Sequence, residues 1–259
     1  MPNHEASGQN EPGLNLIILA HPRSGSTTLR RAFDAHPAIN ILNEPFNPTR
    51  GPGGWGHDYL ADLNKTGDLP AMLRQFSENH NGVKHLLGQL SREQDIEMLR
   101  RYSDRFFLTR RNQLQSVVSC LVAAQTKQWH RHGKVPQVAN AELRPLDIDH
   151  VSRYLNWQID FVQEVRETIE KEQLGCQQVY YEDLFDKNIP LPRRMEIIVQ
   201  LLRPIVGGGF TEEFYRDLAE KLDHNANKVN SEHTYTLLPN AKEIDAEFGS
   251  AETGYLFDS

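Results

Sequence analysis

Residues 14–29, LNLIILAHPRSGSTTL, decide the fold of the first part of this chain. The apolar run Leu14–Ala20 predicts a buried strand, and a turn rich in small hydroxyl residues separates it from the first turn of a helix. That order directs backbone N–H groups and the positive end of a helix dipole at one point, which is how proteins hold phosphate. The stretch therefore predicts a phosphate-binding loop after the first strand.

The loop differs from the common nucleoside-triphosphate pattern G-x-x-x-x-G-K-[ST] in the place of its cation. Ala20 stands at the first glycine, Gly25 at the second, and Ser26 where the lysine belongs. The charge comes earlier, from Arg23, whose forked donors suit an anion. A Ser/Thr N-cap alone would explain the hydroxyl groups but not Arg23 and Gly25. We therefore expect an anionic nucleotide other than ATP bound with Mg²⁺. The candidate hydroxyl donors are Ser24, Ser26, Thr27 and Thr28.

Composition limits the classes of function. With 259 residues the chain can bury a large core in one domain. The formal net charge of −7 argues against an extended basic face for nucleic acid. The two cysteines, Cys120 and Cys176, are too few for a disulfide framework and indicate a reducing, cytoplasmic compartment. No segment approaches the roughly 18–20 apolar residues of a membrane span.

Strand-like and helix-like segments alternate along the chain. The expected strands are Leu14–Ala20, Ile39–Leu42, Val83–Leu87, Arg105–Thr109 and Gln177–Tyr181. The expected helices are Thr27–Ala35, Ala71–Glu78, Ser91–Arg101, Gln113–Trp129, Asp149–Lys171 and Pro192–Ile205. This alternation predicts an α/β fold of three layers, with a mainly parallel sheet and helices on both faces. Ligands of such sheets bind beyond the carboxyl ends of the strands.

One domain accounts for most of the chain. We see no internal repeat and no second domain, so we expect a single domain over residues 14–259 after a disordered lead, residues 1–13. Two long, turn-rich loops, residues 47–57 and 131–147, follow segments that we place near the ligand. An acceptor-binding lid and ordinary mobile surface are equally expected for them.

The segment FFLTRRNQLQSVVS, residues 106–119, gives a second candidate site. A strand ends, two arginines follow, and a helix begins close to Asn112. Ser119 follows Arg111 by eight residues, which is about two helical turns, so both side chains can meet one phosphate if Arg111 folds back over the helix start. A surface arginine and a solvent-facing helix serine would give the same pattern. Its pairing with the first loop favours the binding site.

Glu44, in LNEPFNP at residues 42–48, is the third candidate. It follows an apolar run and should lie at the carboxyl end of a strand. Pro45 biases Glu44 towards an extended backbone that projects its side chain off the strand end. A carboxylate near a positively charged pocket is costly unless it has a catalytic role or forms an ion pair. The residues alone leave two possibilities even: a general base, or an ion pair with Arg23 or another nearby arginine.

These three pieces, in this order and spacing, resemble the sulfotransferases that use 3′-phosphoadenosine 5′-phosphosulfate (PAPS). RSGSTTLRRAFDAHPAINILNEP, residues 23–45, is similar to the opening of the tyrosylprotein sulfotransferases and their bacterial relatives. RRNQLQSVVSCLVAAQTKQW, residues 110–129, is similar to the bacterial carbohydrate branch, the nodulation-factor and trehalose-type enzymes. VYYEDLF, residues 179–185, resembles the later strand and turn of the family.

The resemblance implies a P-loop-like sulfotransferase fold, PAPS as the donor, and no metal. It implies Glu44 as the general base and Arg23 as a catalytic residue that also binds the donor. The 3′-phosphate would be held by Arg111 and Ser119, and Tyr181 would line the adenosine pocket. Lys228 would be a late cofactor-binding lysine. The residues implied to hold the 5′-phosphosulfate are Arg23, Ser24, Gly25, Ser26 and Thr27.

The acceptor expected from the resemblance is a small-molecule or glycan hydroxyl. Ala123 stands where the tyrosylprotein enzymes carry a further arginine, which argues against a peptide. The run QTKQW, residues 125–129, favours a sugar, on which Trp129 could stack, although an aromatic residue at helical spacing is more often part of a core. The alternatives are a P-loop-type small-molecule kinase and a noncatalytic nucleotide- or glycan-binding module.

Overall fold

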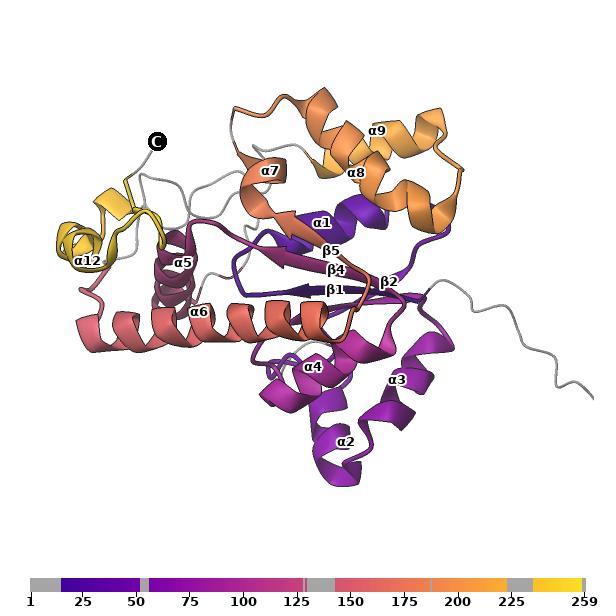
Figure 1. The fold of residues 1–259 in the computed structure, drawn as a ribbon, viewed down its shortest axis with the longest axis horizontal. Helices are drawn as coiled ribbons and strands as arrows, with labels where there is room; N and C mark the ends of the chain where they lie inside the picture. Colours follow the sequence, from indigo (N-terminus) through magenta and orange to yellow (C-terminus); the bar gives the residue numbers. More distant parts are fainter. Residues whose placement is uncertain are drawn as a thin grey trace, which may run out of the picture.

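One parallel sheet of five strands runs through the protein (Figure 1). In the computed structural model, the described residues are 15–51, 56–127, 129, 143–186, 188–222 and 235–257. Every recorded strand pairing is parallel, in the order β2-β3-β1-β4-β5. The expected α/β class with a mainly parallel sheet is confirmed. The strands are β1 (Leu16–Ala20), β2 (Ile41–Asn43), β3 (Gly82–Leu86), β4 (Asp104–Thr109) and β5 (Cys176–Tyr180).

Helices cover both faces of this sheet, as expected. Figure 1 shows α1, α8 and α9 on one face and α2, α3, α4 and α6 on the other. The helices are α1 (Ser26–Phe33), α2 (Tyr59–Thr66), α3 (Leu69–Ser77), α4 (Arg92–Arg101), α5 (Gln113–Thr126), α6 (Ile148–Lys171), α7 (Tyr181–Phe185), α8 (Leu191–Val206), α9 (Glu212–Lys221) and α12 (Ala241–Phe248).

Strand β1 is apolar throughout because both of its faces are covered. All five of its residues are buried. Ile18 belongs to the core that includes residues of α1, α8 and α9, whereas Ile17 and Leu19 belong to the core that includes residues of α3, α4 and α6. Alternate side chains of one strand thus enter the two layers, which is the reason for its unbroken apolar run.

The strand order places a switch point at β1. After β1 the chain forms β2 and β3 on one side of it, and it then crosses to form β4 and β5 on the other side. Crevices at such switch points, beyond the carboxyl ends of the strands, are where open α/β sheets bind ligands. The loops that follow β1, β3 and β4 leave the sheet at this edge.

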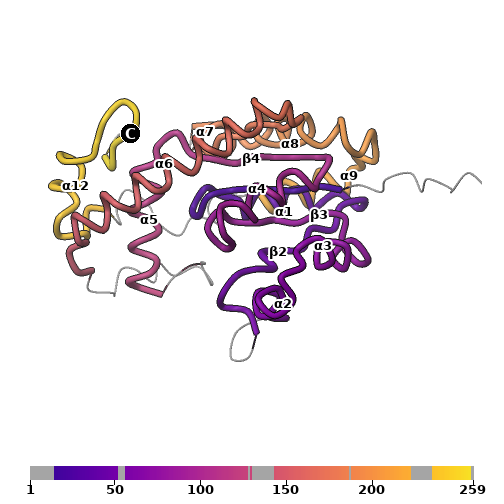
Figure 2. The backbone as a smooth tube through the Cα atoms, turned by 60° about the horizontal axis from the view of Figure 1, so that its bottom comes forward, coloured from indigo at the N-terminus to yellow at the C-terminus, as the bar shows by residue number. Residues whose placement is uncertain are grey.

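A carboxyl-terminal strap, residues 250–256, closes over the start of α5. The Leu114 N–H donates to the Thr253 carbonyl over 2.9 Å, and the Asn112 side-chain amide donates to the Tyr255 carbonyl over 2.7 Å. Figures 1 and 2 show α5 and α12 at the same end of the molecule, where the C-terminus also lies. Chain segments far apart in the sequence therefore pack at the edge where a ligand is expected.

Some expected boundaries are wrong. The helix predicted to reach Trp129 ends at Thr126, since Lys127 has a φ of 57° and its N–H caps the helix by donating to the Ala123 carbonyl. The expected disordered lead, residues 1–13, lies outside the described residues. The single domain over residues 14–259 stays a prediction.

Candidate active site

The loop after β1 leaves backbone donors directed at one point. We call residues 23–27 the cradle. Arg23 and Gly25 both have left-handed backbones, with φ of 65° and 83°, and Gly25 is the N-cap of α1 without a side-chain cap bond. Among the described residues, no acceptor is recorded for the backbone N–H groups of Ser26 and Thr27. Free N–H groups at the positive end of a helix dipole are suited to an anion.

Arg23 brings a guanidinium to the cradle without a carboxylate partner among the described residues. Its Nε donates to Ser119 Oγ over 3.0 Å, and its Nη1 donates to the Trp129 carbonyl over 2.8 Å. Burial lowers the pKa of Arg23, and the charge of Arg110 lowers this pKa as well. Arg23 is partly buried, and its recorded partners are neutral oxygens, which favours binding of an anion from outside the chain.

Two aromatic rings lie against the cradle. A Cβ atom added to Gly25 would lie 2.8 Å from Phe185 Cδ2 and 2.9 Å from Tyr181 Cδ2, so only glycine fits beneath these rings of α7. The guanidinium carbon of Arg110 lies 4.3 Å from the centroid of the Tyr181 ring. Tyr181 therefore lies beside the cradle, and its place in an adenosine pocket stays a prediction. Arg110 was not singled out from the sequence.

Arg111 and Ser119 make separate contacts in the structure. Ser119 is buried and accepts the bond from Arg23. Arg111 is half exposed and forms a two-pronged ion pair with Asp183, over 2.6 and 2.8 Å. Its guanidinium carbon also lies 4.2 Å from the centroid of the Tyr180 ring. No recorded contact among the described residues joins Arg111 to Ser119, and their meeting at one phosphate stays a prediction.

Glu44 is buried, and its carboxylate accepts bonds from three side chains. Oε1 is paired with Lys84 Nζ, while Oε2 accepts from Asn47 Nδ2 over 2.6 Å and from Gln89 Nε2 over 3.0 Å. Burial by itself raises the pKa of Glu44, but the charge of Lys84 and the three hydrogen bonds outweigh it and hold this pKa below its usual range. The carboxylate is therefore ionised at neutral pH.

Two expectations about Glu44 are wrong. Its backbone is left-handed, with a φ of 45°, and not extended. Its N–H is bound to the Lys84 carbonyl over 2.8 Å, and its carbonyl accepts from the Asn47 N–H over 3.1 Å, so strand pairing and a tight turn override the preference set by Pro45. The partner of its carboxylate is a lysine and not an arginine. Backbone strain of this kind is concentrated at functional sites.

Lys84 is the main site residue that sequence reasoning missed. It lies on β3 with its side chain only 1% exposed, and it contacts Glu44. Its Nζ also lies 3.4 Å from Thr27 Oγ1, at the cradle. Burial lowers the pKa of Lys84, and the charge of Glu44 opposes that shift. One available signal was a lysine in the strand sequence GVKHL, residues 82–86, since a buried strand rarely carries a charge without a partner.

His21 joins the loops that follow β1 and β4. Its ring is fully buried, and Nε2 accepts from the Arg110 N–H over 2.9 Å. Its Nδ1 lies 2.8 Å from the Pro22 carbonyl, which places the single proton on Nδ1. Burial lowers the pKa of His21 to about 4, more than the bond to Pro22 raises it, and the charge of Arg110 lowers it further. The neutral ring fixes the start of the cradle.

The other predicted site residues have these positions. Ser24 is buried and donates from its hydroxyl to the His21 carbonyl over 2.8 Å. Thr28, in the first turn of α1, is partly exposed. The Trp129 side chain is exposed and not part of a core. Lys228 lies outside the described residues, as do residues 52–55 and 131–142 of the two long loops.

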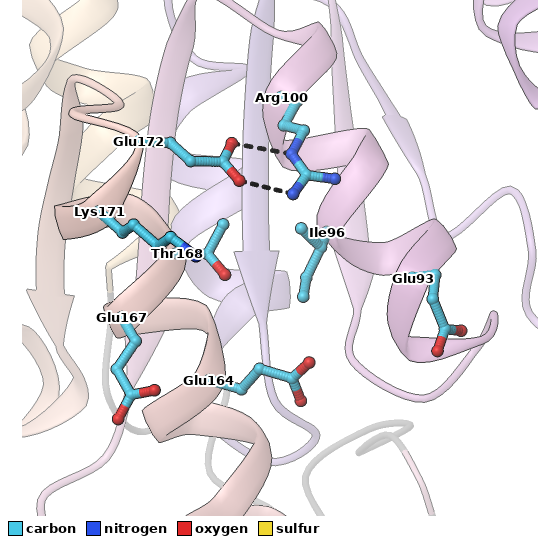
Figure 3. A pocket seen from close by; sticks show the side chains of 8 residues that line it. All are labelled: Glu93, Ile96, Arg100, Glu164, Glu167, Thr168, Lys171 and Glu172. Atoms are coloured by element: carbon cyan, nitrogen blue, oxygen red, sulfur yellow. Dashed lines mark hydrogen bonds and ion pairs between the residues drawn. The ribbon is translucent and has the colours of Figure 1, made fainter.

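A cavity of about 370 Å³ lies elsewhere, between α4 and α6 (Figure 3). Arg100 forms a two-pronged bond with Glu172 there, over 2.8 and 2.6 Å. These two residues come just before β4 and β5, at the amino ends of the strands and away from the cradle. Four of the lining residues are glutamates, so the cavity does not suit an anionic nucleotide. The lining residues are Glu93, Ile96, Arg100, Glu164, Glu167, Thr168, Lys171 and Glu172.

The described part of the chain contains neither a group of metal ligands nor a membrane-spanning helix. No three His, Cys, Asp or Glu side chains there are grouped so that they could hold a metal ion. No helix in the same residues has the length and apolar character needed to cross a bilayer.

The comparisons with known proteins agree with the geometry at the cradle. No curated protein matches the chain. A family model described as the sulfotransferase family matches residues 15–141. That range includes Arg23, Glu44, Lys84 and Ser119. Over residues 15–141 the chain is therefore similar to the sulfotransferase family, which supports sulfuryl transfer as its general chemistry.

Proposed function

We propose that this protein transfers the sulfuryl group of PAPS to an acceptor hydroxyl on a carbohydrate or glycolipid. The observation that carries the proposal is the cradle, where Arg23 lacks a carboxylate among the described residues and two backbone N–H groups lack acceptors. The match to the sulfotransferase family over residues 15–141 supports the same donor chemistry. The donor residues proposed beyond the cradle are Thr28, Arg111, Ser119, Tyr181 and Lys228.

The cradle fits the 5′ end of such a donor. When bound, the donor supplies a sulfuryl group whose S–O bond to the nucleotide phosphate breaks as a new S–O bond forms to the acceptor oxygen. Arg23 and the N–H groups of Ser26 and Thr27 would stabilise the negative charge that grows on the departing phosphate. The products are a sulfate ester and adenosine 3′,5′-bisphosphate.

Glu44 would take the proton of the acceptor hydroxyl. An alcohol is a weak nucleophile while it keeps its proton, so a carboxylate within hydrogen-bond distance raises its reactivity. The proton that leaves the acceptor oxygen goes to a Glu44 oxygen and afterwards to solvent. Glu44 contacts Lys84, and Lys84 in turn contacts Thr27 of the cradle. The carboxylate is therefore close to the proposed donor site, which supports this role.

A sugar acceptor is supported by two features near Arg23. The exposed Trp129 ring belongs to the residue whose carbonyl binds Arg23, so an aromatic surface lies near the cradle. Aromatic rings pack well on the apolar faces of sugars. Ala123, where the tyrosylprotein enzymes carry an arginine, removes a charge that would favour an acidic peptide. The two unpaired cysteines support a cytoplasmic location.

Thermal shift measurements with two nucleotides test the proposal against its alternatives. Adenosine 3′,5′-bisphosphate should raise the melting temperature more than ATP with Mg²⁺, because the cradle lacks the lysine of kinase loops. Sugar and glycolipid hydroxyls should then receive label from ³⁵S-labelled PAPS, while tyrosine peptides should not. A larger shift with ATP and Mg²⁺ would favour the kinase. A shift with the bisphosphate but no transfer to any hydroxyl would favour the binding module.

A further inference from the structure

Lys84 stands between the two parts of the proposed site. Its ammonium group is paired with Glu44 Oε1 on one side and lies 3.4 Å from Thr27 Oγ1 on the other. Thr27 belongs to the cradle, and Glu44 is the proposed base. Lys84 is therefore the described side chain that contacts both the donor-binding loop and the group that would activate the acceptor.

The pairing limits what Glu44 can do as it stands. A carboxylate has about four acceptor positions on its two oxygens. Three are occupied here, by Lys84, Asn47 and Gln89. The Lys84 charge also lowers the pKa of Glu44, which makes it a weaker base. Because Asn47 and Gln89 are neutral, Lys84 is the donor whose removal would most increase the basicity of Glu44.

An anion at the cradle would compete for the same ammonium. Lys84 is wholly buried, so its charge is poorly screened and is strongly attracted to nearby negative groups. A phosphosulfate at the N–H groups of Ser26 and Thr27 would lie beside Thr27 Oγ1, within reach of a flexible four-carbon side chain. Glu44 offers one negative charge, which is already shared with two amide donors.

We propose that Lys84 couples donor binding to acceptor activation. Its ammonium neutralises Glu44 until a donor anion at the cradle draws it away, and Glu44 Oε1 is then open to the acceptor hydroxyl. As a result, Glu44 acts as the general base only in the complex that already holds the donor. It rests on the proposed sulfuryl transfer and gives Lys84 a positioning role for Glu44 as well as a contact with the 5′ end of the nucleotide.

A crystal structure of the unaltered protein with adenosine 3′,5′-bisphosphate tests the coupling directly. Lys84 Nζ should lie within hydrogen-bond distance of a 5′-phosphate oxygen and should no longer contact Glu44 Oε1. If the nucleotide is bound at the cradle and the Lys84–Glu44 contact is intact, the coupling is wrong although the proposed donor site stands. If the bisphosphate does not bind at all, the proposed function itself fails.

Binding affinities give a second test that needs no turnover. Lys84→Met should weaken adenosine 3′,5′-bisphosphate by about tenfold or more, the range for loss of a charged hydrogen bond. Adenosine 3′-phosphate, which lacks the 5′-phosphate, should bind within about twofold of its original affinity. Lys65→Met is the matched control, since it removes an exposed lysine of α2.

The single variant leaves a buried carboxylate without its counter-charge and can unfold for that reason alone. The double variant Lys84→Met with Glu44→Gln restores neutrality and should show the same difference between the two nucleotides. Equal affinity of the folded double variant and the unaltered protein for the bisphosphate would overturn the contact between Lys84 and the donor. Equal weakening for both nucleotides would also overturn it.

Discussion

Two ion pairs near the proposed donor site differ sharply in their surroundings. Lys84 and Glu44 are buried, with side chains 1% and 7% exposed, whereas Arg111 and Asp183 are both 51% exposed. The exposed pair is screened by water and is expected to add little to stability. The buried pair has lost its hydration, so each partner depends on the other. The comparison shows that a partner of the first pair can leave only when another charge takes its place, while the second pair can separate at low cost.

The largest expected effect is the loss of one member of the buried pair. Lys84→Met should lower the free energy of unfolding by about 3–5 kcal/mol, because Glu44 is left buried without a counter-charge. Urea unfolding at pH 7 measures this. Adding Glu44→Gln should recover much of the loss, and a single variant as stable as the original would show that the pair is better hydrated than its burial indicates.

His21 is fully buried, like the Lys84–Glu44 pair. Its pKa of about 4 makes the stability of the folded protein depend on pH. The unfolded chain takes up a proton near pH 6.5, whereas the folded protein does not until about pH 4. Stability should therefore fall by about 3 kcal/mol as the pH decreases from 6.5 to 4. In His21→Gln this part of the slope should be missing from urea unfolding curves. An unchanged slope would assign the acid sensitivity to other groups.

Glu44→Gln tests whether the buried pair has a chemical role. It should lower the rate of sulfuryl transfer by roughly a hundredfold or more, the usual size of a general-base effect, and leave donor binding in place. Turnover with labelled PAPS and calorimetric titration with adenosine 3′,5′-bisphosphate separate the two properties. A near-normal rate would remove Glu44 from the mechanism and leave it as a structural partner of Lys84.

The smallest effect on stability is expected at the exposed pair. Arg111→Ala should change the free energy of unfolding by less than about 1 kcal/mol. If Arg111 exchanges Asp183 for the donor, the variant should still raise the dissociation constant of adenosine 3′,5′-bisphosphate. It should leave the affinity for adenosine 5′-phosphosulfate, which lacks the 3′-phosphate, unchanged. Equal weakening of both nucleotides would place Arg111 away from the 3′-phosphate.

The local order of strand, turn and helix was predictable from the sequence because its causes are local. The apolar run before the cradle, the glycine at its turn and the hydroxyl residues after it are adjacent in the chain. Each expected strand overlaps an observed one, with ends that differ by at most two residues. Gly25 was expected to allow a close backbone approach, and the rings of α7 give a further reason for it.

The polar contacts of the site were less predictable because they join distant parts of the chain. Glu44 and Lys84 are 40 residues apart, and Arg111 and Asp183 are 72 apart. No local pattern indicates which cation a carboxylate meets, so the expected arginine was the wrong partner. The left-handed backbone of Glu44 also depends on a distant residue, because its N–H is bound to the Lys84 carbonyl on β3. Pairing between strands decided both features.

Strand β5 and helix α7 lie beyond residue 141, where the match to the sulfotransferase family ends. β5 pairs along β4 from Arg105 to Thr109. A shortened protein that stopped at residue 141 would expose the hydrogen-bonding edge of β4 and would lose the rings that cover Gly25. Unpaired strand edges recruit other chains, so such a fragment should aggregate rather than fold. For protein production, the boundary of a sequence family is here a poor guide to the boundary of a stable unit.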